Sequence, residues 1–496
     1  ALFPTEIDSW NNAPQSNETP PSMLFSSHEF IFYFLPLCLL GVGLSRYFGR
    51  IAALRLLLGF SLFFYGVFYP PYLALLISSI GVNYFGAELA HNTRSRLVLS
   101  LLIGFNLALL GFYKYADLAV STINTVFGGK LEMLNMVLPL AISFFTFQQI
   151  AYVVDRFRGD LEKQPLLNYA VFIAFFPQLI AGPIVRFQYV AGDLARYGVR
   201  MSSERINWGL SLFVIGLAKK VILADPLGEI ADPVFDANAS GTSPAQPIAW
   251  LALLAYSLQI YFDFSAYSDM AIGIGMVFGL RLPVNFLSPY KSRNIIEFWR
   301  RWHISLSDFL RDYLYFPLGG NRKGPSRRMI NLMLVMLIGG LWHGADWAFM
   351  LWGGIHGALL VVNHYLLDVA GRSRRLSAPV ATGFTFLLVT LAWVPFRANG
   401  LDWISYYQAL LFGAGEAAVH TGALVLVFLG LVIVFTLPNT MEIFDHRDSR
   451  HPLPKYLGAV HWRASPAWLI VSASLFLLSV FLILDGEPNE FIYFQF

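Results

Sequence analysis

The chain has 496 residues, of which 56% are hydrophobic and 13% are charged, whereas an average soluble domain has roughly 25% charged residues. This composition excludes an ordinary soluble protein and indicates a polytopic membrane protein. The net charge of +3 comes from lysines and arginines spread over loops rather than from one basic patch, so we do not expect nucleic acid as a partner. The one cysteine, Cys38, excludes an intrachain disulfide and a cysteine-rich metal site.

Residues 1–22 are polar and contain no lysine or arginine, so they lack the basic segment of a cleavable signal peptide. We expect them to be an N-terminal extension that carries no function, and their origin stays open. Residues 23–496 contain no long soluble insertion and no repeat of solenoid period. They are therefore predicted to form a single membrane-embedded domain.

Apolar runs of about 18 residues or more can cross a bilayer as helices. Such runs appear along the whole chain, near residues 29–47, 52–68, 71–90, 97–115, 137–154, 166–185, 206–224, 248–263, 265–282, 329–345, 348–367, 380–396, 420–438 and 466–484. Proline or glycine interrupts several of them. We expect some to be re-entrant, which is allowed where protein or a water-filled cavity satisfies the backbone.

Basic residues mark the loops that face the cytoplasm, because cytoplasmic loops carry an excess of lysine and arginine. Arg46, Arg50 and Arg55 place the first loop inside, and the loops near residues 156–163 and 372–375 are also basic. Both termini then lie outside, which requires an even number of crossings. We predict an all-α, polytopic transmembrane bundle of about 12 crossings, with re-entrant and interfacial helices.

A polar segment rich in tryptophan and arginine interrupts this pattern at residues 297–313. At roughly 100° per residue, its charged side chains fall on one side and its aromatic ones on the other, which predicts an amphipathic helix. Glu297 precedes Arg301 by four residues, a favourable spacing for an ion pair. His303 falls at the edge of the apolar face. The alternative is a surface-lying helix in which this histidine forms only a structural hydrogen bond.

His343 lies at the end of the apolar run 329–344, which contains no other ionisable residue. Gly339, Gly340 and Gly344 supply the small surface that lets helices approach closely. Burial there favours the neutral imidazole, and a neutral imidazole can act as a general base. The alternative is a structural role as an interhelical hydrogen-bond partner. For His356, thirteen residues further on, we expect packing rather than catalysis.

Asp263 and Asp269 interrupt apolar runs, and buried carboxylates must be paired or protonated. They can orient a histidine, accept an arginine from the central segment, or join the two histidines at a metal. We expect no metal, because the chain has no H-E-x-x-H or comparable ligand spacing. Lys219 and Lys220 are expected to face lipid headgroups, with an anionic donor as the alternative.

At these residues the chain resembles the membrane-bound O-acyltransferase family, in its bacterial polysaccharide O-acetylation branch. The resemblance is carried by motifs along the chain: MLFSS from Met23, LPLAISFFTF from Leu138, IAGPIVR from Ile180, GLAKK from Gly216, YFDFSAYSD from Tyr261, FWRRWHISL from Phe298, RDYLYFPLGG from Arg311, GLWHG from Gly340 and FIYFQF from Phe491.

The resemblance implies a helical bundle around a central tunnel, with an acyl donor arriving from the cytoplasm and an acceptor from the other face. By position in the motifs, His343 matches the catalytic histidine of the family, and His303 matches its partnering polar residue. The implied donor is acetyl-CoA, with no metal, and no residue is assigned to its binding. The implied location is the bacterial inner membrane, with both termini periplasmic.

We therefore expect an O-acyltransferase in which neutral His343 takes a proton from an acceptor hydroxyl, and this hydroxyl attacks the acetyl thioester. His303 or the indole N–H groups of Trp299, Trp302 and Trp342 would stabilise the oxyanion. The expected acceptor is an extracellular or periplasmic alginate-like polysaccharide, or a periplasmic protein that passes the acetyl group on. The alternatives are D-alanyl or peptidoglycan acyl transfer in the same family, a polytopic transporter, and a non-catalytic scaffold.

Overall fold

The structure of the protein is a computed structural model that describes residues 23–179, 182–198, 203–370, 376–398, 400–415, 419–445, 461–486 and 491–492. The predicted extension at residues 1–22 lies outside the described residues. Throughout the described ranges the regular elements are helices, which confirms the predicted all-α fold.

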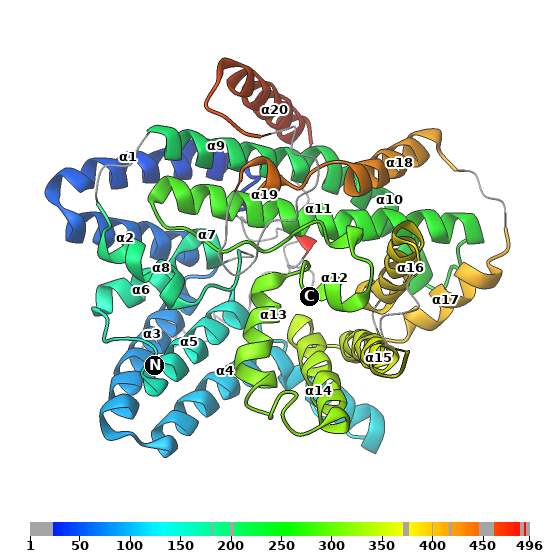
Figure 1. The fold of residues 1–496 in the computed structure, drawn as a ribbon, viewed down its shortest axis with the longest axis horizontal. Helices are drawn as coiled ribbons and strands as arrows, with labels where there is room; N and C mark the ends of the chain where they lie inside the picture. The colour runs from blue at the N-terminus through cyan, green and yellow to red at the C-terminus, as the bar shows by residue number, and fades with distance from the viewer. Residues whose placement is uncertain are drawn as a thin grey trace, which may run out of the picture.

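The first part of the chain folds into the helices drawn in blue to cyan in Figure 1: α1 (Leu35–Ser45), α2 (Arg50–Phe68), α3 (Pro71–Thr93), α4 (Arg96–Phe127), α5 (Ile142–Arg158), α6 (Leu166–Ala174), α7 (Phe176–Leu179) and α8 (Phe187–Ala195). A π-helical turn, Glu29–Phe34, leads directly into α1. Pro71 opens α3, where its missing N–H breaks no helical hydrogen bond. Gly128 ends α4 in the left-handed conformation, with φ of 64°.

The remaining helices are α9 (Ser203–Ala218), α10 (Asp225–Ala239), α11 (Gln246–Phe278), α12 (Ile295–Trp299), α13 (Ile304–Leu310), α14 (Pro325–His343), α15 (Trp347–Ala370), α16 (Ala378–Arg397), α17 (Asp402–Phe412), α18 (Thr421–Thr436), α19 (Thr440–Ile443) and α20 (Pro466–Asp485). Two π-helical turns extend neighbouring helices: Lys219–Ala224 joins α9 to α10, and Arg311–Tyr315 continues α13.

Eight helical segments in the described residues are long and apolar enough to cross a membrane: Glu29–Phe48, Arg50–Phe68, Pro71–Thr93, Arg96–Phe127, Gln246–Phe278, Trp347–Asp368, Ala378–Arg397 and Pro466–Asp485. Helix α18 is apolar but shorter. The runs predicted separately at 248–263 and 265–282 form one helix, α11, and the run at 166–185 breaks at Phe175 between α6 and α7. The total of about 12 crossings stays a prediction.

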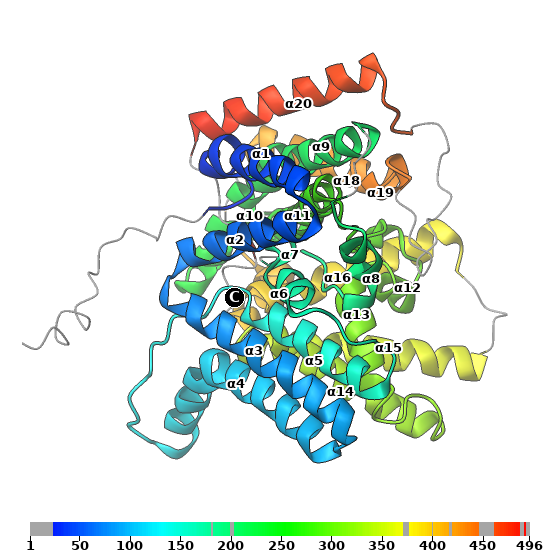
Figure 2. The same cartoon turned by 90° about the vertical axis from the view of Figure 1, so that its left-hand side faces the viewer.

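Helix α11 is the central element of the bundle, as Figures 1 and 2 show. In its most apolar stretch 72% of the residues are buried, whereas the corresponding value for α20 is 11%. Helix α20 lies along the edge of the molecule in both views. A helix with its sides covered by protein tolerates polar residues that find partners there, so α11 can carry Asp263 and Asp269 without a break.

Those two carboxylates pair with the lysines that the sequence analysis assigned to lipid headgroups. Nζ of Lys220 lies 2.9 Å from Asp263 and 2.6 Å from Asp225, and Nζ of Lys219 lies 2.7 Å from Asp269. Lys220 is 3% exposed. The headgroup assignment was therefore wrong, because the π-helical turn directs both lysines inward onto α11. The carboxylates are held by these lysines rather than by arginines of the central segment.

The amphipathic helix predicted at residues 297–313 is not continuous. Helix α12 ends at Trp299, a turn follows, and α13 begins at Ile304 after His303, whose φ is +43°. The predicted ion pair is confirmed, with Arg301 donating to Glu297 at 2.6 Å. His303, predicted at the edge of the apolar face, is fully buried. The regular spacing of charges in the sequence does not indicate the turn between α12 and α13.

Candidate active site

Helices α14 and α15 form a tight hairpin that fixes the position of His343. A Cβ added at Gly340 would lie 2.3 Å from the carbonyl oxygen of Phe349, and one added at Gly353 would lie 2.2 Å from the carbonyl oxygen of Met336. Real side chains cannot fit at such distances, so glycine at these positions lets the two backbones touch. The predicted close approach at Gly340 is confirmed.

His343 ends α14 inside a cluster of aromatic rings and is 4% exposed. Its ring centroid lies 5.1 Å from those of Trp342 and Trp352 and 5.3 Å from that of Phe396. The ring of His303 lies 6.2 Å away. The fold thus brings together the two histidines that the sequence analysis singled out, in surroundings that exclude bulk water.

Two side chains of α4 hold the end of α14 in place. The amine of Lys114 donates to the carbonyl oxygens of Trp342 at 2.7 Å and His343 at 2.9 Å, and the hydroxyl of Tyr115 donates to that of Leu341 at 2.8 Å. The last carbonyls of a helix have no partner within it. The sequence analysis missed both residues, although Lys114 is the one charged residue in the apolar run 97–115.

His303 is held by Asn285, which lies between α11 and α12. Nδ1 of His303 lies 3.2 Å from Oδ1 of Asn285, and the backbone N–H of Ile304 donates to the Asn285 carbonyl at 3.0 Å. The side-chain amide of Asn285 in turn donates to Ser268 on α11 at 3.1 Å. These bonds fix the turn in which His303 takes its positive φ.

The same asparagine selects the tautomer of His303. The backbone N–H of Ser305 donates to Oδ1 of Asn285 at 3.3 Å, so this atom is an acceptor and Nδ1 of His303 must donate to it. Burial lowers the pKa of His303, so the ring is neutral at pH 7 and its lone pair sits on Nε2. As a neutral ring, His303 can accept a proton at Nε2 but cannot donate a hydrogen bond there.

Several buried polar atoms around the two histidines have no hydrogen-bond partner in the described part of the chain. They are Nε2 of His303, Nε1 of Trp342, Nε1 of Trp352, Nε2 of His356 and both amide atoms of Gln148. Leaving one buried polar group unpaired costs about 1–3 kcal/mol. Similar atoms occur elsewhere in the described residues, but those on the histidines and indoles lie beside a candidate catalytic residue, where a polar ligand can satisfy them.

Of the indoles considered as oxyanion donors, Trp342 and Trp299 differ in what they contact. The indole of Trp342 lies beside both histidines, 6.1 Å from the His303 ring between centroids. Trp299 instead donates its N–H to Nδ1 of His356 at 3.3 Å. His356 is fully buried among Trp299, Trp352 and Trp393, where the sequence analysis expected packing.

Comparison of the sequence with known proteins identifies the family of this chain. The sequence model of the membrane-bound O-acyltransferase family matches residues 158–374. The probable alginate O-acetylase of Pseudomonas putida is 38% identical over 501 residues, which cover 96% of this chain and 100% of that protein. The chain belongs to the membrane-bound O-acyltransferase family.

Two further relatives of this acyltransferase differ in the group or polymer that their names give. The peptidoglycan O-acetyltransferase of Helicobacter pylori is 44% identical, over 77% of this chain and 78% of its own length. The teichoic acid D-alanyltransferase of Streptococcus thermophilus is 28% identical, over 51% of this chain and 62% of its own length. The protein is thus a multi-pass membrane enzyme that transfers acyl groups. In the described residues no three His, Cys, Asp or Glu side chains are grouped as metal ligands.

The acyltransferase has a charged surface cavity lined by residues of α5, α8 and the π-helical turn that continues α13. This basin has a volume of about 860 Å³ and is lined by Asp155, Arg158, Asp160, Arg186, Gln188, Asp312, Tyr313, Phe316, Pro317 and Arg322. A void of about 10 Å³ shares Arg186 with the basin and is also lined by Ile304, Ser305, Asp308 and Phe309. The basin and the void thus share one lining residue, and the void reaches Ile304 and Ser305, the two residues that follow His303.

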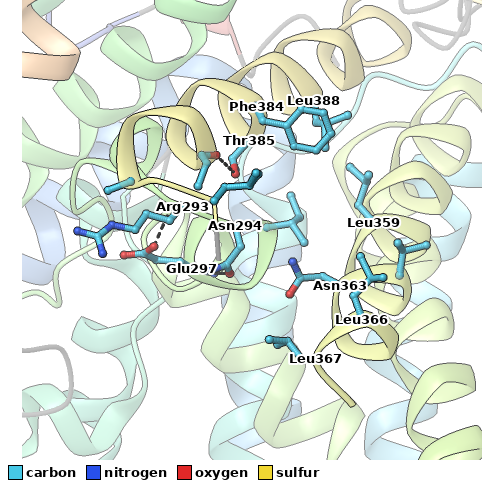
Figure 3. Close-up of a pocket in the computed structure, with 15 residues that line it drawn as sticks. Arg293, Asn294, Glu297, Leu359, Asn363, Leu366, Leu367, Phe384, Thr385 and Leu388 are labelled. Carbon is cyan, nitrogen blue, oxygen red and sulfur yellow. Dashed lines mark hydrogen bonds between the residues drawn. The ribbon is translucent and has the colours of Figure 1, made fainter. Parts of the chain in front are cut away.

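A second cavity, of about 770 Å³, lies between α12, α15 and α16. Its walls are mostly apolar, with Leu359, Leu366 and Leu367 on α15 and Phe384 and Leu388 on α16, as Figure 3 shows. Figure 3 also places Asn363 between these leucines, and Arg293, Asn294 and Glu297 along the α12 side. This groove differs from the basin, because apolar side chains of two candidate membrane spans form most of it.

Proposed function

We propose that this acyltransferase moves an acetyl group from acetyl-CoA in the cytoplasm to a hydroxyl group on the outer side of the inner membrane. The observation that supports this most is the buried pair His343 and His303, with ring centroids 6.2 Å apart and with polar atoms nearby that have no hydrogen-bond partner among the described residues. Relatives named for O-acetylation of alginate and of peptidoglycan cover most of the chain. An alginate-like polysaccharide is therefore the proposed final acceptor.

In the proposed reaction, a ring nitrogen of neutral His343 accepts the proton of the acceptor hydroxyl. The hydroxyl oxygen forms a bond to the thioester carbonyl carbon, and the carbonyl oxygen becomes an oxyanion. Collapse of this intermediate breaks the carbon–sulfur bond, and the leaving thiolate takes the proton back from the imidazolium, giving an ester and free CoA. General-base help of this kind contributes roughly 10²- to 10⁴-fold.

The two histidines take different parts in this proposal. The indole N–H of Trp342 is the donor proposed for the oxyanion, because it is buried beside both rings and has no partner in the described residues. His303 carries a lone pair on Nε2, so it serves as a second proton acceptor rather than as an oxyanion donor. This role replaces the alternative in which His303 stabilises the oxyanion.

The charged basin is the proposed entrance for the donor. Arg158 and Arg322 can contact phosphate groups, whereas Arg186 is paired with Asp312. The loop near residues 156–163 is basic, as cytoplasmic loops are. The apolar groove between α15 and α16 offers fewer such groups. With this orientation both chain termini face the periplasm. The immediate acceptor is a hydroxyl of the polysaccharide, or of a periplasmic protein that passes the acetyl group on.

The experiment uses the full chain in lipid nanodiscs, with acetyl-CoA and the envelope polysaccharide fraction of its own cells. Wild-type protein should release CoA and label the acceptor, and His343→Ala should reduce both rates at least about 100-fold. His28→Ala, at a half-exposed histidine, should leave them unchanged. Equal rates in wild type and His343→Ala would contradict the proposal. D-alanyl transfer would appear as labelling from a D-alanyl thioester but not from acetyl-CoA.

A further inference from the structure

Gln148 on α5 is buried with an amide that contacts no partner. The residue is 1% exposed, and neither Nε2 nor Oε1 has a hydrogen-bond partner in the described residues. The next residue shows the contrast, because Oε1 of Gln149 accepts hydrogen bonds from Ser79 and Asn83, both at 2.7 Å. Nε2 of Gln149 also has no partner in the described residues, so the two side chains differ at the amide oxygen, which is bonded in Gln149 and not in Gln148.

The side chain of Gln148 belongs to the face of α5 that covers the active site. Residues four and seven apart lie on one face of a helix. One turn before Gln148, Phe144 contacts Trp342, with ring centroids 5.4 Å apart. After it, Ala151 lines the void beside Ser305, and Asp155 accepts a hydrogen bond from Tyr313 at 2.7 Å.

Along this face, Gln148 lies between the charged basin and the histidines. Asp155 at one end lines the basin, and Phe144 at the other end contacts the indole next to His343. Seven residues separate Gln148 from Asp155, which is about 10 Å along a helix. In the proposed reaction, a donor whose phosphates occupy the basin and whose thioester reaches His343 extends along this face of α5, past the amide of Gln148.

We propose that Gln148 binds an amide group of the pantetheine arm of the donor. A glutamine amide with both its donor and its acceptor unused is complementary to a ligand that offers one acceptor and one donor. A secondary amide has this pair, and the arm of CoA between thioester and phosphates carries such amides. An acyl chain or a sugar ring does not require this combination of one donor and one acceptor. This inference rests on the proposed function, because it assigns a contact to the proposed donor.

Such a contact is made along the arm and not at the reacting carbonyl. Its loss should therefore raise KM and leave kcat nearly unchanged, as expected for uniform binding of ground and transition states. Loss of two neutral hydrogen bonds should change kcat/KM by about tenfold or more. For a donor without amides, KM and kcat/KM should be unchanged by the substitution, since such a donor does not make this contact.

The test compares acetyl-CoA with S-ethyl thioacetate, which has the acetyl thioester and no amide, on the full chain in nanodiscs with the acceptor fraction. Wild-type protein should prefer acetyl-CoA strongly in kcat/KM. Gln148→Met, of similar length, should raise KM for acetyl-CoA about tenfold or more and leave S-ethyl thioacetate unaffected. Gln149→Leu is the matched control and should lower the midpoint of thermal unfolding without changing the preference between donors.

The outcomes are distinct. Wild-type protein that does not turn over acetyl-CoA would contradict the proposed function and this inference with it. Turnover in wild type with an unchanged KM in Gln148→Met would overturn this inference alone. A lower unfolding midpoint in Gln148→Met without a change in donor preference would show that the amide holds a structural water, which also overturns it. If Gln148→Met does not fold, Gln148→Glu, which keeps the shape and loses the donor, takes its place.

Discussion

Nδ1 of His303 donates a hydrogen bond to Oδ1 of Asn285, across 3.2 Å. The direction of this bond follows from a backbone group, because the N–H of Ser305 donates to the same oxygen. Because the asparagine oxygen accepts both bonds, the lone pair of the histidine is on Nε2, which has no hydrogen-bond partner among the described residues. Asn285 therefore determines the tautomer of His303 and leaves Nε2 as its proton acceptor.

Replacing Asn285 by leucine should reduce kcat at least about tenfold, because the ring loses the bond that fixes its tautomer and orientation. Asn285→Asp keeps an acceptor and should retain more activity. Its carboxylate favours the imidazolium and raises the pKa of His303, which burial otherwise lowers. The active form is neutral, so the acid limb of the pH–rate profile should move to higher pH. An unshifted limb would mean that His303 does not exchange a proton in the reaction.

Gly340→Ala should destabilise the protein by about 1–3 kcal/mol, because overpacked cores cost this much. The new methyl group would meet the carbonyl of Phe349 at 2.3 Å and push α15 away from α14. Thermal unfolding in detergent measures the loss. Gly104→Ala on α4 is the control, since nothing lies within 4 Å of its added Cβ, and it should be neutral or slightly stabilising. Equal effects of the two changes would contradict the close contact.

Lys114→Met should lower acetyl transfer while the protein still folds. The change leaves the carbonyl oxygens of Trp342 and His343 without their donor, so the end of α14 loses its fixed position. We expect a decrease in kcat of about tenfold, as a small displacement of a catalytic group produces. Lys130→Met, at an exposed lysine beyond the end of α4, should have no effect on the rate. Similar acetyl-transfer rates for the two variants would show that Lys114 does not contribute to the active site.

The sequence predicted the helical membrane fold and the buried position of His343, because apolar periodicity and the glycines of α14 carry that information directly. It did not predict the turn at His303, which depends on Asn285 eighteen residues earlier. Lys114 was also missed, since it acts on residues almost 230 positions away. Such contacts form only when the helices pack together. Local patterns of hydrophobicity do not indicate which helices become neighbours.

The ion pair between Lys220 and Asp263 is a second long-range contact that can be tested by substitution. Lys220 lies 2.9 Å from Asp263, and the backbone N–H of Ile492 donates to the other oxygen of that carboxylate at 2.8 Å. Lys220→Met leaves Asp263 charged, 2% exposed and without its cation, which should cost about 3–5 kcal/mol of unfolding free energy. Removing one partner of a buried pair is more costly than removing both.

The double variant Lys220→Met with Asp263→Asn should therefore be more stable than Lys220→Met alone. The asparagine removes the buried charge and keeps an oxygen for the N–H of Ile492. Thermal unfolding of the single and double variants measures the difference, with Arg281→Met as the control. Arg281 is 56% exposed and its pair with Asp193 should contribute at most about 1 kcal/mol. A double variant no more stable than Lys220→Met would show that the loss does not come from the unpaired charge of Asp263 but from the lysine side chain or from its second partner, Asp225.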